Sequence, residues 1–120
     1  MRILIVEDNL DSVHTLVALV REMGHSAEYA INGYAALSAA RKFRPDVVFL
    51  DLGLPGMTGF EVCKQLRTVL GLDGIRIYSL TAYGDAEFRT QALESGCDAH
   101  FVKPMHPKQL AELLRPRGEA

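Results

Sequence analysis

Five short apolar segments recur along the chain, and each is followed by polar residues or a turn. The runs at 3–6 and 47–50 are unbroken in apolar residues, which is typical of strands buried in a sheet, and the latter strand ends at Asp51. The segments 75–80 and 99–102 are expected to be the fourth and fifth strands. The segment 26–30 is mixed in polarity. Glu28 within it indicates an edge strand, where a charge also discourages pairing with a second chain. The pattern therefore predicts five strands, of which 26–30 lies at an edge of the sheet.

The segments between these strands carry apolar residues at helical spacing. Five helices are expected, over about 10–23, 35–44, 59–70, 85–95 and 107–115. Asn9 or Asp8 is expected to cap the first helix and Gly24 to end it, while Asn32-Gly33 indicates a turn before the second. Strands that alternate with helices at short spacing predict a parallel, doubly wound α/β sheet, with residues 1–120 forming one domain.

Local sequence signals indicate where two of these helices begin. Thr58 and Glu61 have the spacing of a capping box at the start of the third helix, which should run through 69–70 to Gly71. Pro107 suits the first position of the last helix. His106 before it is a weak cap and Lys108 lies at the unfavourable end of the helix dipole, so we expect this helix to be the least stable.

Composition excludes several classes of function. The formal net charge of −2 and pI of about 6.1 give no basic surface for nucleic acid or for a membrane. No apolar run approaches the roughly 20 residues needed to cross a bilayer, and the N-terminus is too short in apolar residues for a signal peptide. A cytoplasmic protein is expected. Cys63 and Cys97 form no metal-binding or disulfide pattern and are interpreted as small packing residues.

Functional groups stand at the end of four predicted strands. Glu7 and Asp8 follow the first, Asp51 ends the third, Thr81 follows the fourth and Lys103 follows the fifth. Parallel strands present their carboxyl ends at one edge of the sheet, which is where ligands bind in open α/β folds. The acids meet only if the first and third strands are neighbours. The flavodoxin-like strand order 2-1-3-4-5 provides this.

Three carboxylates within a few ångströms repel one another unless a cation joins them. Oxygen ligands at an open site favour a hard divalent ion, and Mg²⁺ also pairs carboxylates with phosphate. With its charge shielded, Asp51 can act as a nucleophile at phosphorus and form an acyl phosphate. The Lys103 ammonium and the Thr81 hydroxyl are suited to bind the phosphoryl oxygens.

This ordered set resembles the receiver domain of two-component response regulators, over essentially the whole chain. The matching residues are Glu7-Asp8, Asp51, Thr81-Ala82 and Lys103-Pro104. The resemblance implies a phosphoacceptor that serves signalling and is not an enzyme in the ordinary sense. It also implies a histidine kinase or histidine phosphotransfer protein as partner, and a monomer or a phosphorylation-dependent dimer.

The resemblance assigns a role to each site residue. Asp51 is the phosphoacceptor, Asp8 and Asp51 are direct Mg²⁺ ligands, Glu7 acts through water, and the Gly53 backbone carbonyl completes the protein ligands. The family also tends to have a cis peptide at the position of Lys103-Pro104.

One position departs from the family pattern. Receivers often carry Tyr or Phe three residues before the lysine, as a switch coupled to the threonine, here Thr81. This chain has His100 there, with Phe101 beside it. A histidine there allows sensitivity to pH near neutrality and resembles receivers that work with hybrid sensor kinases. A partly exposed histidine with a purely structural role is the alternative interpretation of His100. Tyr83 is a second candidate, as a shield of the acyl phosphate or as a plain surface residue.

Other functions stay open at this point. A receiver fold can serve as a binding module without phosphorylation. A flavin carrier shares the sheet order, but Glu7 and Asp8 would repel a flavin phosphate. A phosphatase with an aspartate nucleophile needs a second acid two residues later, where this chain has Gly53. Whether the chain acts alone or within a hybrid kinase or larger regulator is not determined by these residues.

Overall fold

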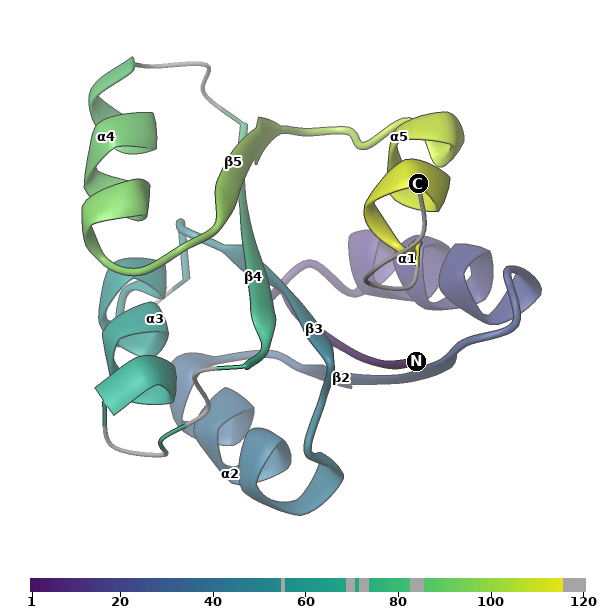
Figure 1. The fold of residues 1–120 in the computed structure, drawn as a ribbon, viewed down its shortest axis with the longest axis horizontal. Helices are drawn as coiled ribbons and strands as arrows, with labels where there is room; N and C mark the ends of the chain where they lie inside the picture. Colours follow the sequence, from purple (N-terminus) through teal and green to yellow (C-terminus); the bar gives the residue numbers. More distant parts are fainter. Residues whose placement is uncertain (55, 69–70, 72–73, 83–85, 116–120) are drawn as a thin grey trace.

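The fold is a five-stranded parallel sheet covered by five helices, as seen in a computed structural model that describes residues 1–54, 56–68, 71, 74–82 and 86–115 (Figure 1). The elements in chain order are β1 (Arg2–Val6), α1 (Leu10–Glu22), β2 (Ser26–Ala30), α2 (Gly33–Phe43), β3 (Val47–Asp51), α3 (Gly59–Thr68), β4 (Arg76–Thr81), α4 (Ala86–Glu94), β5 (Ala99–Val102) and α5 (Pro107–Leu113). The strand order β2-β1-β3-β4-β5 confirms the flavodoxin-like prediction, with β2 at an edge.

Two hydrophobic layers hold the helices against the sheet. Figure 1 shows α2, α3 and α4 on one face and α1 and α5 on the other. Successive residues of β1 and β3 face opposite layers, because side chains alternate along a strand. Leu4, Val6, Val48 and Leu50 face the first layer, and Ile3, Ile5, Val47 and Phe49 face the second. All eight are at most 1% exposed, as the unbroken apolar runs predicted.

Side-chain caps fix the start of several helices. The Asn9 carboxamide accepts a hydrogen bond from Ser12 N at 3.1 Å, which confirms one of the two predicted caps of α1. Asn32 does the same for α2 through Ala35 N at 2.8 Å, so the predicted turn is also a helix cap. Thr58 Oγ1 accepts from Glu61 N at 3.3 Å, which is one of the two bonds of the predicted capping box, while Glu61 Oε1 accepts from Gln65 Nε2 at 3.4 Å. The expected extension of α3 through 69–70, and Asp85 at the start of α4, lie outside the described residues.

His106 occupies the cap position of α5, as the sequence indicated. Its ring Nδ1 accepts a hydrogen bond from Lys108 N at 3.2 Å. Histidine is not among the preferred N-cap residues, so the weakness of this cap stays a prediction. The relative stability of α5 stays a prediction.

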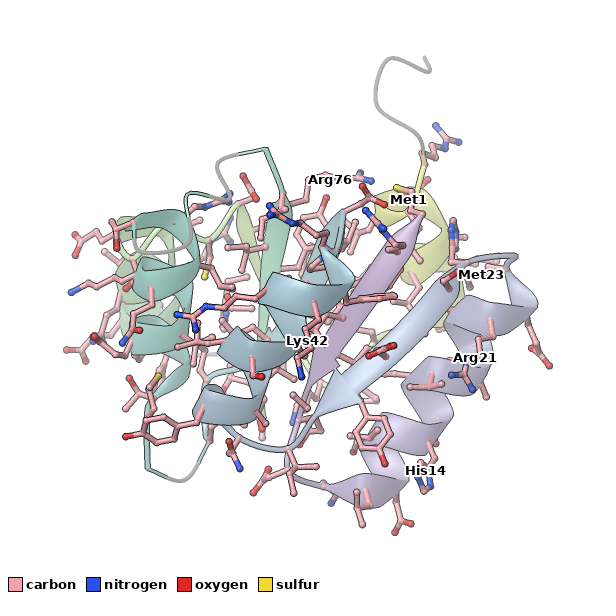
Figure 2. All side chains as sticks on the ribbon, turned by 90° about the horizontal axis from the view of Figure 1, so that it is seen from below. Met1, His14, Arg21, Met23, Lys42 and Arg76 are labelled. Atoms are coloured by element: carbon pink, nitrogen blue, oxygen red, sulfur yellow. The ribbon has the colours of Figure 1, made fainter. Side chains whose placement is uncertain are left out.

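The amino-terminal edge of the sheet is closed by contacts to backbone groups. Arg76 donates from Nη1 to the carbonyl oxygens of Leu113 at 2.9 Å and Arg115 at 3.2 Å, and its Nη2 lies 2.9 Å from Met1 Sδ. Figure 2 shows Met1 and Arg76 together at this end of the molecule, with His14 at the opposite end. Arg76 thereby joins the start of β4 to the last turn of α5. Among the described helices, none is both long and apolar enough to pass through a bilayer.

Candidate functional site

Strand register brings the predicted site residues to one edge of the sheet. Val6 of β1 pairs with Leu50 of β3, so Glu7 and Asp51 are the next residues of two neighbouring strands. On the other side of β3, Asp51 pairs with Leu80 of β4, immediately before Thr81. The predicted meeting of the first and third strands therefore occurs, and it places acids from both at the carboxyl edge.

Three carboxylates form a compact group at this edge. One oxygen each from Glu7, Asp8 and Asp51 lie within 4.8 Å of one another. Glu7 is 2% exposed and Asp51 7% exposed, whereas Asp8 is open to solvent. Glu7 and Asp51 thus form the buried part of the group and Asp8 the exposed part. An ion or a phosphoryl group can reach the acids from the solvent on the side of Asp8.

Lys103 places its ammonium against the two buried acids. Its Nζ contacts Glu7 Oε2 directly and lies 3.3 Å from Asp51 Oδ2. The lysine follows β5, and its backbone N–H donates to Thr81 O at 2.8 Å, which ties it to the end of β4. The Lys103-Pro104 peptide bond is cis, as the family resemblance implied.

Burial and charge act on this pair in opposite directions. Burial raises the pKa of Glu7, and the nearby Asp51 charge adds to the effect, while the hydrogen bond from Lys103 opposes it. For Lys103 burial favours the neutral form, but the hydrogen bond to Glu7 and the charge of Asp51 outweigh it and raise its pKa. The ammonium therefore stays charged and offsets part of the negative charge of the acids.

Backbone contacts orient Asp51. The N–H of Gly53 donates to Asp51 Oδ1 at 3.0 Å, so one carboxylate oxygen is held by the loop and the other faces Lys103. Gly59, the first residue of α3, lies so close that an added Cβ would be 2.6 Å from the Asp51 carbonyl oxygen and 2.7 Å from Leu52 Cα. The start of α3 thus supports the end of β3 through a contact that only glycine allows.

The donor set fits a hard divalent cation. Carboxylate oxygens from two strand ends converge, and a single ammonium does not neutralise three acids. Mg²⁺ prefers such oxygen ligands and retains waters at the open positions. The roles of Asp8 and Asp51 as direct ligands, of Glu7 through water and of the Gly53 carbonyl stay predictions.

Thr81 is buried at 5% exposure, at the same edge. Its carbonyl accepts from Lys103 N, so the two residues predicted to bind the phosphoryl oxygens are linked through the backbone. The structure thus brings Glu7, Asp8, Asp51 and Lys103 into one group with Thr81 beside it. Tyr83, the predicted shield, lies outside the described residues.

The predicted switch residue His100 faces inward and bonds to a residue of β4. Its Nδ1 lies 2.8 Å from Ser79 Oγ, and within the described part of the chain its buried Nε2 has no hydrogen-bond partner. Burial lowers the pKa of His100, and the Arg89 charge lowers it further. Phe101 belongs to the layer beneath α1 and α5, where it contacts Tyr78 edge to face. Phe101 therefore does not replace His100 at the position where receivers often carry Tyr or Phe.

Ser79 was missed by sequence reasoning. It is fully buried and lies two residues before Thr81, on the same face of β4. The signal was a lone hydroxyl inside an apolar strand, because a buried polar side chain needs a partner. Register supplies that partner, since Ser79 pairs directly with His100.

A groove of about 320 Å³ runs from the acids along α1 to the turn after β5. Glu7 and Lys103 form its polar end, and Leu16, Leu19 and Met105 contribute to its apolar wall. The site is therefore open on the side of α1.

Comparisons with known proteins agree with this geometry. The family model described as response regulator receiver domain matches residues 3–115. The DNA-binding response regulator MtrA of Mycobacterium tuberculosis (strain ATCC 25618 / H37Rv) is 40% identical over 116 residues, which cover 97% of this chain and 50% of that protein. Sporulation initiation phosphotransferase F of Bacillus subtilis (strain 168) is 32% identical, over 95% of this chain and 90% of that protein.

Solved structures place the fold in the same group. Chemotaxis protein CheY4 of Vibrio cholerae superposes with a TM-score of 0.88 at 30% identity, covering 94% of each chain. A response regulator of Chloroflexus aurantiacus gives 0.87 at 30% identity over 93% of this chain and 92% of that one. The chain spans about half the length of MtrA and nearly all of the Bacillus phosphotransferase. With fold, strand-end residues and relatives in agreement, this chain belongs to the family of response regulator receiver domains.

Proposed function

We propose that Asp51 accepts a phosphoryl group from a phosphohistidine of a partner kinase or phosphotransfer protein, with Mg²⁺ at the acid group. The observation that carries the proposal is the position of the Asp51 carboxylate. It lies between two further acids and the Lys103 ammonium, at the open edge of the sheet. A carboxylate that served only to cap a helix or to close a loop would need neither neighbour.

The transfer moves the phosphoryl group between two nucleophiles. An Asp51 oxygen attacks phosphorus while the bond from phosphorus to the histidine nitrogen breaks, and the leaving imidazole keeps the electron pair. The product on this chain is an acyl phosphate. A bound Mg²⁺ would supply positive charge to the phosphoryl oxygens. The chain supplies position: Gly53 N holds one Asp51 oxygen, and Lys103 adds a cation.

Phosphorylation changes the partners of Lys103 and Thr81. Lys103 contacts Glu7 and Asp51 in the present state, and a phosphoryl group on Asp51 adds oxygens of higher charge next to its ammonium. Thr81 can donate its hydroxyl to another of these oxygens. Ser79 and His100 lie on the same face, so a movement of Thr81 reaches the layer beneath α4. This arrangement supports a signal that is read on the surface of α4, β5 and α5 by a second protein.

The experiment uses a small acyl phosphate in place of the protein donor. The full chain is incubated with acetyl phosphate and Mg²⁺, and intact mass spectrometry reports the added phosphoryl group. Asp51→Asn should lose the addition entirely. Asp46→Asn is the matched control, because Asp46 accepts from Arg2 N at 2.7 Å at the opposite edge of the sheet. It should be phosphorylated like the unaltered chain.

Two results would overturn the proposal. One is phosphorylation that persists in Asp51→Asn. The other is a chain that binds Mg²⁺ at millimolar concentration but accepts no phosphoryl group and shows no spectral response to beryllofluoride. The second result would favour a binding module that works without phosphorylation.

A further inference from the structure

A pair of thiols lies in contact away from the acid site. Cys63 of α3 and Cys97, which precedes β5, place their Sγ atoms 3.2 Å apart. They are 0% and 5% exposed and belong to the layer beneath α2, α3 and α4. Their burial agrees with a role in packing, and their contact also brings together two groups that can react with each other. The S–S bond of a disulfide measures about 2.05 Å, so oxidation requires an approach of only roughly 1 Å.

The backbone holds Cys97 in place from both sides. Its N–H donates to Ala92 O at 3.1 Å, at the end of α4, and the next N–H, of Asp98, donates to Ile77 O at 2.8 Å. Gly96 before it has a φ of +108°, a backbone conformation that favours glycine. A Cβ at Gly96 would lie 3.7 Å from Cys63 Sγ and 3.1 Å from Arg67 Cγ. The α4–β5 connection is therefore held close to α3 by backbone contacts, and this places the two thiols in contact.

Arg67, one turn after Cys63, fastens the same two segments. It donates to Gly96 O at 3.1 Å and to Ile75 O at 2.7 Å, and it pairs with Asp98 Oδ2 at 2.8 Å. Its guanidinium also brings positive charge to the thiols. The hydrogen bond from Cys97 lowers the pKa of Cys63, with help from Arg67 and against the effect of burial. The same hydrogen bond, together with burial, raises the pKa of Cys97. Cys63 is thus the thiol of the pair that ionises more readily.

We propose that Cys63 and Cys97 are a reversible dithiol–disulfide pair that a hydroperoxide oxidises, joining α3 covalently to the α4–β5 connection. In the first step, with hydrogen peroxide as the oxidant, Cys63 releases its proton and the thiolate attacks one peroxide oxygen while the O–O bond breaks. The leaving hydroxide takes up the released proton, so a sulfenic acid and one water are formed. In the second step the Cys97 sulfur displaces the hydroxyl group from Cys63 as a second water. In sum, two thiols and one hydrogen peroxide give one disulfide and two waters.

The bond would act on a functional part of the fold. It would link residues 34 positions apart and restrain the segment that leads from α4 into β5 and His100. A closed loop restricts the unfolded chain, so the oxidised protein should melt several degrees higher than the reduced one. Amide hydrogens near Cys97 should also exchange more slowly after oxidation.

The first test treats the reduced, full chain with hydrogen peroxide. Remaining thiols are then labelled with a maleimide in denaturant and the intact mass is measured. We expect the loss of two hydrogen atoms, no maleimide label, a cross-linked peptide containing both cysteines, and full reversal by dithiothreitol. Cys63→Ser and Cys97→Ser should each fail to form an intramolecular cross-link. Two free thiols after peroxide treatment, or oxygen adducts and dimers in place of the cross-link, would overturn the proposal.

A second measurement needs no variant and therefore does not depend on whether a variant folds. The fraction of disulfide is measured in glutathione buffers of graded ratio, once under native conditions and once in urea. If the fold holds the thiols together, the effective concentration of one thiol at the other is at least tenfold higher in the native chain than in urea. An equal or lower native value would show that the fold does not favour the bond, and the proposal would fail.

Discussion

The parallel strands begin at one edge of the sheet, the amino-terminal edge, and end at the other, the carboxyl edge. Charged side chains at these two edges have different kinds of partner. At the amino-terminal edge, Arg76 donates to the carbonyl oxygens of Leu113 and Arg115, and Asp46 accepts from the backbone N–H of Arg2. At the carboxyl edge, Glu7 and Asp51 face the ammonium of Lys103. One edge pairs its charges with the main chain, and the other pairs them mainly with each other.

This difference separates a structural edge from a ligand-binding edge. A charge that is bonded to backbone groups has its partners fixed by the fold and gains nothing from a ligand. Three acids that share one ammonium keep oxygen lone pairs available and retain a net negative charge. Both properties favour the binding of a cation. Substitutions at the amino edge should therefore change stability alone, whereas substitutions at the carboxyl edge should change ligand binding as well.

The largest effect is expected from Gly59→Ala, which acts on the carboxyl edge through the backbone. The new Cβ would be 2.6 Å from Asp51 O, so β3 or α3 must move, at a cost of about 2–3 kcal/mol in the free energy of unfolding. Urea unfolding measures this loss, and Mg²⁺ titration should show weaker binding. Gly74→Ala is the control, since no atom of another described residue, apart from its chain neighbours, lies within 4 Å of its added Cβ. Equal stability of the two variants would show that the contact at Gly59 is not a constraint.

Arg76→Ala should cost somewhat less and should leave the ligand site unaffected. The substitution removes two hydrogen bonds from a charged donor to α5, worth about 1–2 kcal/mol together at this half-buried position. Urea unfolding should report the loss, while the Mg²⁺ dissociation constant stays unchanged. A change in Mg²⁺ affinity as large as that of Gly59→Ala would break the distinction between the two edges.

Lys103→Met tests the carboxyl edge by removing its only described cation. Its Nζ lies 3.3 Å from Asp51 Oδ2, so its loss should strengthen Mg²⁺ binding by about three- to tenfold, equivalent to about 1 kcal/mol. Phosphorylation by acetyl phosphate should slow in the same variant, because the ammonium no longer neutralises the incoming group. Lys108→Met, at an exposed position of α5, should change neither quantity. Weaker Mg²⁺ binding in Lys103→Met would mean that the lysine organises the acids more than it competes with the ion.

The strands could be predicted from the sequence because they follow from short-range patterns of apolar residues. Their order and the acid group followed from the requirement that acids at several strand ends meet, which the flavodoxin-like order satisfies. Apolar runs set the bounds of β3 and β5, and the parallel topology then places their ends at one edge. Sequence reasoning did not reach contacts that depend on the length and direction of single side chains. Lys103 was expected to bind a phosphoryl group, but its direct contact with Glu7 depends on how far the side chain extends.

Contacts across elements were the hardest to predict. The pairing of Ser79 with His100 depends on the register of β4 against β5, and a shift of one residue would turn Ser79 to the opposite layer. The contact between Cys63 and Cys97 depends on how α3 lies against the connection after α4. No periodicity in the sequence carries that information.

The smallest effect is expected at His100, as a change in how stability depends on pH. Burial lowers its pKa in the folded chain, so the unfolded chain binds the proton more readily. The contribution of His100 to the free energy of unfolding is then fully present above the pKa of the unfolded chain, about 6.5. It is lost as the pH falls from that value toward the lower pKa of the folded chain. His25, whose pKa burial also lowers, contributes in the same window and should be unaffected by a change at His100. His100→Phe should therefore reduce the loss of stability between pH 7.5 and pH 5.5 in urea unfolding, and His25→Gln should reduce it separately. An unchanged pH profile in His100→Phe would mean that the imidazole accepts its proton in the folded chain, with the buried Nε2 finding a partner when charged.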